Sequence, residues 1–192
     1  MRLRRSMLPL AALVLAAGPA TQGRGETPTQ LLRLHQLQVV GTHNSYHLRP
    51  KSALLQLATA VQSDAREWDY SHAPLDVQLD RGVRSFELDL HWSAAGWEVF
   101  HLPLIDNQTS CRRFLEALQT VRRWSDAHPG HAPISFLLEL KEEGLLLDAK
   151  LKRPDAAALD QIDKEIRTAF PADRLLTPDE VRGEREIGRA HV

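Results

Sequence analysis

The sequence has a single cysteine, Cys111, and almost no net charge. One thiol cannot form an intrachain disulfide, which excludes a cysteine-rich secreted scaffold. The 24 basic and 25 acidic residues give a formal net charge of -1, so the composition does not predict a nucleic-acid partner. Internal repeats and low-complexity linkers are also missing. With 43% hydrophobic and 26% charged residues among 192, the composition is that of one globular domain.

The sequence also lacks a hydrophobic run long enough to span a bilayer. The longest apolar run, Met7–Ala17, has eleven residues, whereas a crossing needs about twenty. Arg2, Arg4 and Arg5 precede this run, and small residues follow it at 18–20. A basic start, a short apolar middle and a small-residue end predict a secretory signal peptide. We expect cleavage after Ala20 and a secreted or periplasmic protein without a transmembrane segment.

Short apolar runs alternate with longer amphipathic ones through the middle of the chain, which predicts an α/β fold. Four strands with helices between most of them favour a parallel sheet in a (β/α) TIM-type barrel. We expect it to be truncated after four or five strands, because a full barrel needs about 250 residues. We expect strands over Leu37–Thr42, Val83–Leu90, Trp97–His101 and Ile134–Leu140, a further strand at Leu175–Leu176, and helices over Lys51–Arg66, Pro74–Gly82, Thr109–His128 and Asp155–Phe170.

The last seven residues, Glu186–Val192, have neither a helical nor a strand period. Their sequence can be encoded by the start of a common short-read sequencing adapter. We therefore expect 186–192 to be an adapter artefact and the chain to be the N-terminal portion of a longer protein. The expected organisation is a signal peptide at 1–20, a lead-in at 21–36, a partial barrel at 37–185 and the artefact at 186–192.

Polar side chains interrupt the apolar pattern at the ends of the expected strands. Glu87 and Asp89 are two residues apart, so on a strand both point to the same face. Glu139 and the amide oxygen of Asn44 complete an all-oxygen set at the same rim of a parallel barrel. Ca²⁺ or Mg²⁺ prefers such ligands, whereas Zn²⁺ favours histidine and cysteine. The alternative is a structural network in which Glu87 and Asp89 pair with arginines such as Arg84.

Histidines also lie at these strand ends. His43 and His101 are the acid–base candidates, because imidazole titrates near neutral pH. Two histidines beside a hard cation suit in-line phosphoryl transfer. The pattern leaves the roles of His47 and His91 open. Lys141 is either a contact for a phosphate oxygen or a solvated lysine beside acidic neighbours.

Four segments, GTHNSYH, RSFELDLHW, EVFH and LLELK, follow one another in this order. Together they resemble the catalytic domain of phosphoinositide-specific phospholipase C, in its secreted, calcium-dependent bacterial branch. The resemblance runs from about Leu37 to Arg182. It implies a phospholipase C-like phosphodiesterase barrel with bound Ca²⁺, Mg²⁺ being the weaker candidate. The residues it implies are His43 and His101 as catalytic histidines, Asn44, Glu87, Asp89 and Glu139 as calcium ligands, and Lys141 as a contact for phosphate or the inositol ring.

The resemblance also implies a reaction. The inositol 2-hydroxyl attacks the phosphodiester of a phosphatidylinositol-type lipid at a membrane surface, which releases diacylglycerol and an inositol cyclic phosphate. Which histidine is the base and which the acid is left open. We expect the 192-residue chain alone to be inactive, because the family's barrel continues beyond it.

Two alternatives remain. One is a glycerophosphodiester phosphodiesterase, a related barrel that also carries an E-x-D pair followed by histidine; sphingomyelinase-like enzymes share this logic. The other is a non-catalytic exported fragment that binds calcium or lipid headgroups. The sequence does not determine the oligomeric state.

The adapter hypothesis makes a prediction at the level of DNA. Genomic sequence read through the codon for Glu186 should diverge from the given sequence there, and the reading frame should continue. A genome that encodes residues 186–192 followed by a stop codon contradicts the hypothesis.

Overall fold

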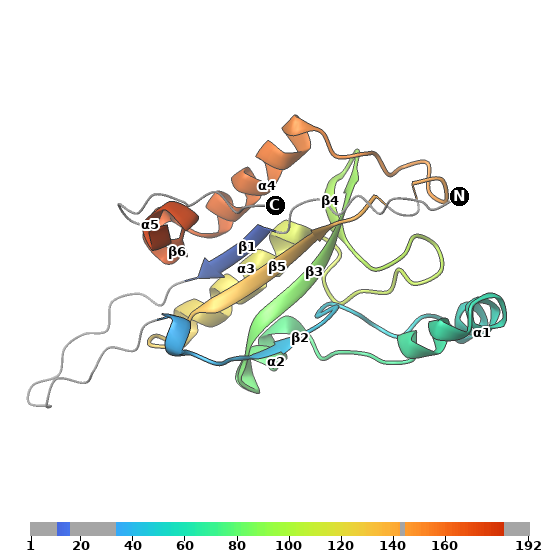
Figure 1. Ribbon diagram of the computed structural model, residues 1–192, viewed down its shortest axis with the longest axis horizontal. Helices are drawn as coiled ribbons and strands as arrows, with labels where there is room; N and C mark the ends of the chain where they lie inside the picture. The colour runs from blue at the N-terminus through green and yellow to red at the C-terminus, as the bar shows by residue number, and fades with distance from the viewer. Residues whose placement is uncertain (1–10, 16–33, 143–144, 183–192) are drawn as a thin grey trace, which may run out of the picture.

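The computed structural model describes residues 11–15, 34–142 and 145–182. Most of the expected signal peptide, the greater part of the lead-in and the expected artefact at 186–192 lie outside the described residues. Within the described part, six strands form one sheet in the order β2-β3-β5-β1-β6, with β4 paired to β3 (Figure 1). The strands are β1 (Ala11–Leu15), β2 (Val40–Thr42), β3 (Val83–Ser93), β4 (Gly96–Val99), β5 (Ile134–Leu140) and β6 (Leu175–Leu176).

Three of these strands, β2, β3 and β5, run parallel. Parallel neighbours need a crossover connection, and helical segments supply it on both occasions. Between β2 and β3 lie α1 (Ser52–Val61), the 3₁₀ helix η2 (Ser63–Trp68) and α2 (Leu75–Asp80); between β3 and β5 lie β4 and α3 (Phe114–Ala127). The remaining helical segments are η1 (Leu34–Gln36), α4 (Ala156–Ala169), η3 (Ala172–Arg174) and α5 (Pro178–Arg182). Within the described ranges, every helix is too short or too polar to cross a membrane.

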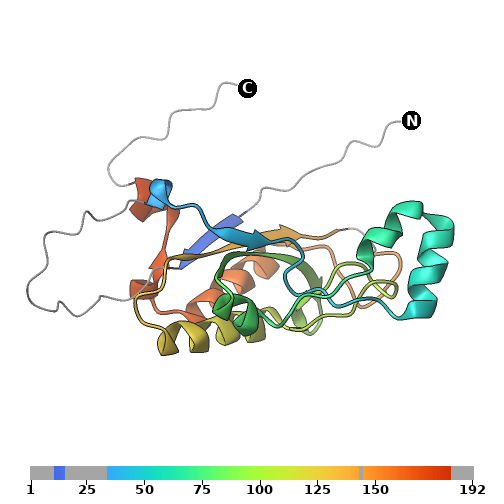
Figure 2. The same cartoon turned by 90° about the horizontal axis from the view of Figure 1, so that it is seen from below.

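The hydrophobic core lies between one face of the sheet and the helices α2, α3 and α4. Alternate residues of β3 and β5 point to this face, and Phe86 and Phe136 pack against each other at 5.7 Å between ring centroids. The apolar stripe of α3 packs against them, with Leu118 and Val121 fully buried. Figure 2 shows α2, α3 and α4 on the same side of the sheet. The opposite face of β3 and β5 is therefore left for polar residues.

The strand expected over Trp97–His101, after a turn through Gly96, is present, but it is not one of the parallel strands of the expected barrel. The strand here is β4, and it pairs antiparallel with β3, with Trp92 opposite Trp97. Only two residues separate β3 from β4, and Gly96 follows with a φ of +96°. So short a connection can only form a hairpin. The fold is a mixed α/β arrangement with a partly open sheet, and the truncated barrel stays a prediction.

The helix expected over Lys51–Arg66 is divided. Gln62 adopts an extended conformation, with φ of −138° and ψ of 111°, between α1 and η2. The helix expected over Thr109–His128 begins later, at Phe114. By contrast, the expectation for Asp155–Phe170 is confirmed by α4, where the Asp155 carboxylate accepts a hydrogen bond from the Ala158 amide at 2.9 Å. An aspartate cap of this kind satisfies an otherwise unpaired amide of the first turn.

Strand β1 comes from the apolar run of the expected signal peptide. Its backbone pairs antiparallel with β5, from Ala11 opposite Leu138 to Leu15 opposite Ile134, and on its other side with β6. It therefore covers the edge of β5 that faces away from β3. The signal peptide itself stays a prediction.

We predict that Phe86→Ala destabilises the chain by about 3–5 kcal/mol, because it removes a fully buried ring from a close-packed core and leaves a cavity. Urea denaturation followed by circular dichroism measures the change. Val61→Ala is the control, since Val61 is 84% exposed on α1 and should change stability by less than about 0.5 kcal/mol. Equal effects of the two substitutions would contradict this description of the core.

Candidate metal and acid–base site

Three carboxylates meet on the face of the sheet opposite the helices. Glu87 and Asp89 are two residues apart on β3, so their side chains lie on the same face. The register of β3 with β5 places Asp89 beside Glu139. One carboxylate oxygen from each of the three lies within 4.8 Å of the others. Asp89 and Glu87 are buried, at 1% and 6% exposure, whereas the side chain of Glu139 is 43% exposed. The cluster thus has a buried floor and one open side.

The loop after β2 brings Asn44 to the same place. Asn44 has a φ of +47°, in the left-handed region that asparagine tolerates better than most residues. Its backbone amide donates to Glu87 Oε2 at 2.6 Å, and its side-chain oxygen accepts a hydrogen bond from the Tyr46 hydroxyl at 2.9 Å. Asn44 is 5% exposed. The turn therefore fixes one oxygen of Glu87 and presents an amide oxygen near the carboxylates.

Buried polar side chains hold this loop against β3. The Ser45 hydroxyl accepts a hydrogen bond from the Glu87 amide at 2.9 Å and donates to the Thr42 carbonyl at 2.9 Å. Gln78 of α2 donates to the Ser45 carbonyl at 2.7 Å and accepts from the Thr42 hydroxyl at 2.8 Å. At Gly41, an added Cβ would lie 3.1 Å from the Cβ of Ser85, so a side chain there would push β2 away from β3. These contacts set the position of Asn44 relative to the carboxylates.

Burial makes the ionised form of these acids unfavourable. It raises the pKa of Asp89 to about 8, with the charge of Glu87 adding to the rise. Burial also raises the pKa of Glu87, in spite of the amide hydrogen bond from Asn44. Glu87 Oε1 and Asp89 Oδ1 are buried without a hydrogen-bond partner in the described part of the chain. Buried carboxylate oxygens that are left unpaired fit the ligands of a hard cation.

Lys141 supplies positive charge to this cluster. Its ammonium group lies 2.9 Å from Glu139 Oε1 and 3.3 Å from Asp89 Oδ2, and its side chain is 15% exposed. Burial alone would lower the pKa of Lys141, but the charges of Asp89 and Glu139 outweigh burial and raise it. The lysine therefore stays protonated and partly compensates the carboxylates.

A second group of titratable side chains follows β4. His101 Nδ1 lies 2.7 Å from Asp106 Oδ2, and His47 Nε2 lies 2.9 Å from Asp106 Oδ1. Asp106 is fully buried. Burial alone would raise the pKa of Asp106, but the hydrogen bonds from His101 and His47 outweigh burial and lower it. The carboxylate is therefore ionised at neutral pH and holds one imidazole on each side.

Tyr46 lies between the two groups. It is fully buried, and burial together with the negative charges of Asp89, Glu87 and Asp106 raises the pKa of its hydroxyl. The next residue in the chain is His47, so Tyr46 connects the loop of the acidic cluster to the histidine group. The hydroxyl remains protonated and donates to Asn44.

The predicted site residues are brought together unevenly. Asn44, Glu87, Asp89, Glu139 and Lys141 converge, and a hydrogen bond or ion pair joins each of them to another member. The imidazole of His43 is exposed and makes no hydrogen bond or ion pair among the described residues. The backbone carbonyl of His43 does accept one from His72 Nε2 at 2.9 Å. The structure thus does not join His43 and His101 by a direct contact.

Two possibilities that the sequence left open are resolved by contacts. Arg84 does not pair with the carboxylates: its guanidinium donates to the Leu79 and Val83 carbonyls and lies over the Trp124 ring at 4.7 Å. The alternative in which Glu87 and Asp89 pair with Arg84 is therefore wrong. His91 is 1% exposed and stacks on Phe100 at 4.0 Å, and burial lowers its pKa to about 4. His91 packs in the interior as a neutral side chain.

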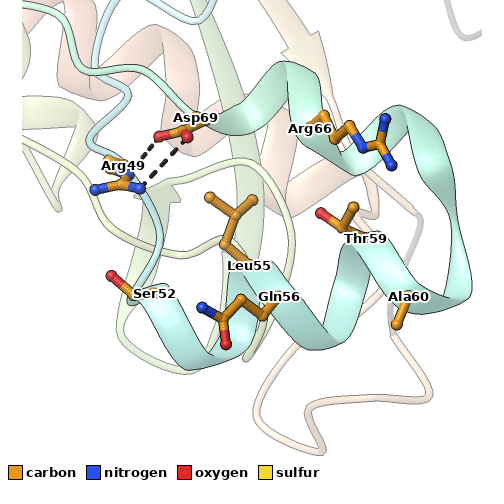
Figure 3. A pocket seen from close by; sticks show the side chains of 8 residues that line it. All are labelled: Arg49, Ser52, Leu55, Gln56, Thr59, Ala60, Arg66 and Asp69. Atoms are coloured by element: carbon orange, nitrogen blue, oxygen red, sulfur yellow. Dashed lines mark hydrogen bonds and ion pairs between the residues drawn. The ribbon is translucent and has the colours of Figure 1, made fainter.

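A cavity of about 520 Å³ lies elsewhere, between α1 and the segment after it. Figure 3 shows Arg49 and Asp69 facing each other at one end, with Leu55 extending from α1 toward the opposite segment. None of its lining residues belongs to the predicted site. The acidic cluster does not line this cavity.

Sequence reasoning missed Asp106 and left His47 undecided. Asp106 lies in a loop, so no pattern of alternating apolar residues indicates where its side chain points. Its position depends on backbone hydrogen bonds between Leu102 and Asp106, at 2.8 and 3.2 Å in the two directions. The one local signal is its closeness in sequence to His101.

Comparison with known proteins gives one family and one solved structure. The family model described as phosphoinositide phospholipase C, Ca²⁺-dependent, matches residues 32–96 and 91–190. No curated protein matches the chain. A crystal structure of a calcium-dependent phosphoinositol-specific phospholipase C from the Gram-negative bacterium Pseudomonas sp., in its apo form, is similar at 25% sequence identity with a TM-score of 0.44. That match covers 57% of this chain and 39% of the other, so the chain spans well under two thirds of the length of that protein.

The raised pKa values predict how stability depends on pH. The folded chain holds the Asp89 proton more tightly than the unfolded chain, because the pKa rises from 3.8 to about 8. In the presence of a chelator, stability should therefore be highest below about pH 4 as far as this group is concerned, and should fall as the pH rises toward about 8. Thermal melting across this range measures the effect. Asp89→Asn should flatten the dependence, and an unchanged slope in that variant contradicts the assignment.

Proposed function

The chain belongs to the Ca²⁺-dependent phosphoinositide phospholipase C family, and we propose that it carries the calcium-binding and acid–base half of a lipid phosphodiesterase. The substrate we propose is a phosphatidylinositol-type lipid at a membrane surface. The observation that carries the proposal is the convergence of Glu87, Asp89 and Glu139 on one face of the sheet. Because the matched structure is much longer than this chain, the activity of a whole enzyme is part of the proposal.

We propose that Asn44, Glu87, Asp89 and Glu139 hold the calcium ion. The donor set consists of oxygens only, which Ca²⁺ prefers. Two of the carboxylates have oxygens without a hydrogen-bond partner in the described part of the chain. A bound cation lets these buried acids ionise at neutral pH, against the effect of burial on their pKa. When bound, calcium supplies positive charge for the phosphate oxygens and for the attacking hydroxyl.

Lys141 has a second role in this proposal. Its ammonium group contacts Asp89 and Glu139, the same carboxylates that we assign to calcium. With these oxygens holding a cation, the lysine ammonium group would be free to contact a phosphate oxygen or the inositol ring. The open side of the cluster, where Glu139 is 43% exposed, leaves room for this change.

His101 is the better placed of the two proposed acid–base residues. Its side chain is 19% exposed, and its Nδ1 is engaged by Asp106, so Nε2 is the nitrogen left for proton transfer. His43 is the second candidate and is exposed on the loop that carries Asn44. In the reaction that the family implies, the base accepts the proton of the inositol 2-hydroxyl as its oxygen attacks phosphorus. The acid gives a proton to the diacylglycerol oxygen as its bond to phosphorus breaks.

The remaining expectations stand as proposals about the whole protein. We propose export through a signal peptide at 1–20, and a (β/α) barrel of which 37–185 forms the first part. The parallel strands β2, β3 and β5, their helical crossovers and the helices on one face support this architecture. The carboxylates then point to the inside of the barrel, at the rim where the parallel strands end.

Calcium binding gives the first test. We predict that Glu87→Gln weakens binding at least tenfold, or by about 1.4 kcal/mol, because it removes a buried charge from the cluster. Titration calorimetry of the 192-residue chain measures the affinity. Glu142→Gln is the matched control, since Glu142 pairs with Arg153 outside the cluster and its side chain is 30% exposed. If both variants bind calcium like the unaltered chain, the proposed site is wrong.

Activity is tested on vesicles that contain phosphatidylinositol, with calcium or with a chelator, and phosphorus NMR identifies the products. We assay the 192-residue chain and the product of the full genomic reading frame. A cyclic inositol phosphate that forms only with calcium supports the proposal. Cleavage of glycerophosphocholine alone indicates a glycerophosphodiester phosphodiesterase. Calcium binding without cleavage of either substrate indicates a binding fragment.

A further inference from the structure

We propose that Asp106 is a positioning residue for His101, and that His47 holds the Asp106 carboxylate in the orientation this requires. The inference rests on the proposed function, because it takes His101 to be an acid–base group. None of the sequence motifs assigns a role to Asp106. We call His47, Asp106 and His101 the relay; of these three side chains only that of His101 is partly exposed, at 19%.

The contact between Asp106 and His101 fixes the state of the imidazole. An ionised carboxylate only accepts hydrogen bonds, so the 2.7 Å contact from Asp106 Oδ2 requires a proton on His101 Nδ1. In the neutral imidazole, Nε2 is then the unprotonated nitrogen. Asp106 is fully buried whereas the His101 side chain is 19% exposed. The carboxylate thus determines both the tautomer of His101 and the direction of its ring.

His47 holds the other oxygen of the same carboxylate. His47 Nε2 lies 2.9 Å from Oδ1 and 3.0 Å from Oδ2 of Asp106, so this nitrogen also carries a proton. His47 is 1% exposed, and its Nδ1 is buried without a hydrogen-bond partner among the described residues. His47 therefore acts in the relay through Nε2, as a hydrogen-bond donor to Asp106.

Rings on both sides limit the movement of the two imidazoles. Tyr70 stacks on His47 with ring centroids 4.3 Å apart and an angle of 28° between the planes. The edge of Trp68 contacts His101 at 5.5 Å between centroids. Both aromatic residues belong to the segment at the end of η2. Packing of these rings adds to the hydrogen bonds in keeping each imidazole in one orientation.

The backbone ties the loops that carry the three residues. Asp106 follows His101 in a loop that is closed by two hydrogen bonds between Leu102 and Asp106. Two backbone hydrogen bonds join the loop with His47 to residues 108–110, which follow Asp106. The Ser110 amide donates to the Tyr46 carbonyl at 2.8 Å, and the Leu48 amide donates to the Gln108 carbonyl at 3.2 Å. The relay is thus set on a rigid frame, as a positioning role requires.

Nitrogen-15 NMR of the histidines tests the relay directly, without any need for activity. In the unaltered chain, at a pH where the imidazoles are neutral, His101 should be protonated on Nδ1 and His47 on Nε2. Asp106→Leu has a similar shape but cannot accept a hydrogen bond, and it should shift His101 toward the Nε2-protonated tautomer. A His101 that carries its proton on Nε2 in the unaltered chain overturns the proposal, even if the leucine variant does not fold.

Variants at His47 separate positioning from stability. His47→Gln keeps a donor near the place of Nε2, whereas His47→Leu removes it. We expect the glutamine variant to keep His101 protonated on Nδ1 and the leucine variant to lose this preference. Leu118→Ala, which removes a buried side chain from α3, is the control for general destabilisation and should leave the tautomer unchanged. If it shifts the tautomer as much as His47→Leu does, the relay has no specific role.

Kinetics of the active protein complete the test. Asp106→Leu should lower kcat by about 10²–10⁴-fold, the usual range for loss of an acid–base group, with KM within about twofold. Unchanged kcat in this variant overturns the positioning role. If the unaltered protein does not cleave phosphatidylinositol at all, the proposed function fails, while the NMR result still decides whether Asp106 and His47 orient His101.

Discussion

The burial of Glu87 and Asp89 on the central strand is the constraint that shapes the site. Two carboxylates side by side on β3 repel each other, and burial removes the water that would stabilise their charge. Two contacts stabilise the charge: the Asn44 amide donates to Glu87, and the Lys141 ammonium group contacts Asp89. These contacts compensate the charge only in part, since Glu87 Oε1 and Asp89 Oδ1 have no hydrogen-bond partner among the residues that the structure describes. This deficit of positive charge supports the proposal that a cation binds here.

The two faces of the sheet have different roles: one packs against the helices, and the other carries the candidate site. Odd and even positions of β3 alternate between faces, so one strand supplies both the core residue Phe86 and the neighbouring site residue Glu87. The helices cover the core face and give it its stability. The loops after β2 and β4 converge on the other face, where hydrogen bonds between buried polar groups fix them. Rigidity for the site therefore comes from the same strand that anchors the core.

Much of this arrangement follows from the sequence, and the rest depends on pairings that no local pattern records. The two-residue spacing of Glu87 and Asp89 predicts a shared face, and the helical spacing over Asp155–Phe170 predicts α4. The turn through Gly96 predicts two consecutive strands, but the antiparallel pairing of β4 departs from the parallel order expected of the barrel. The contact between Asp106 and His47 joins residues 59 positions apart, and it is set by loop hydrogen bonds, not by periodicity. Strand β1 was likewise expected to be part of a signal peptide and not part of the sheet.

The turn at Asn44 has a consequence for how this protein can change over generations. The left-handed backbone at φ +47° excludes β-branched residues and favours glycine, asparagine or aspartate. Glycine would keep the turn and lose the side-chain oxygen that Tyr46 contacts; aspartate would keep the oxygen and add a fourth negative charge to the cluster. Few single mutations can satisfy both the backbone and the charge balance. Substitution of residue 44 is thus restricted both by its backbone conformation and by the charge of the cluster. A different residue there would mark a copy of this gene whose site has altered.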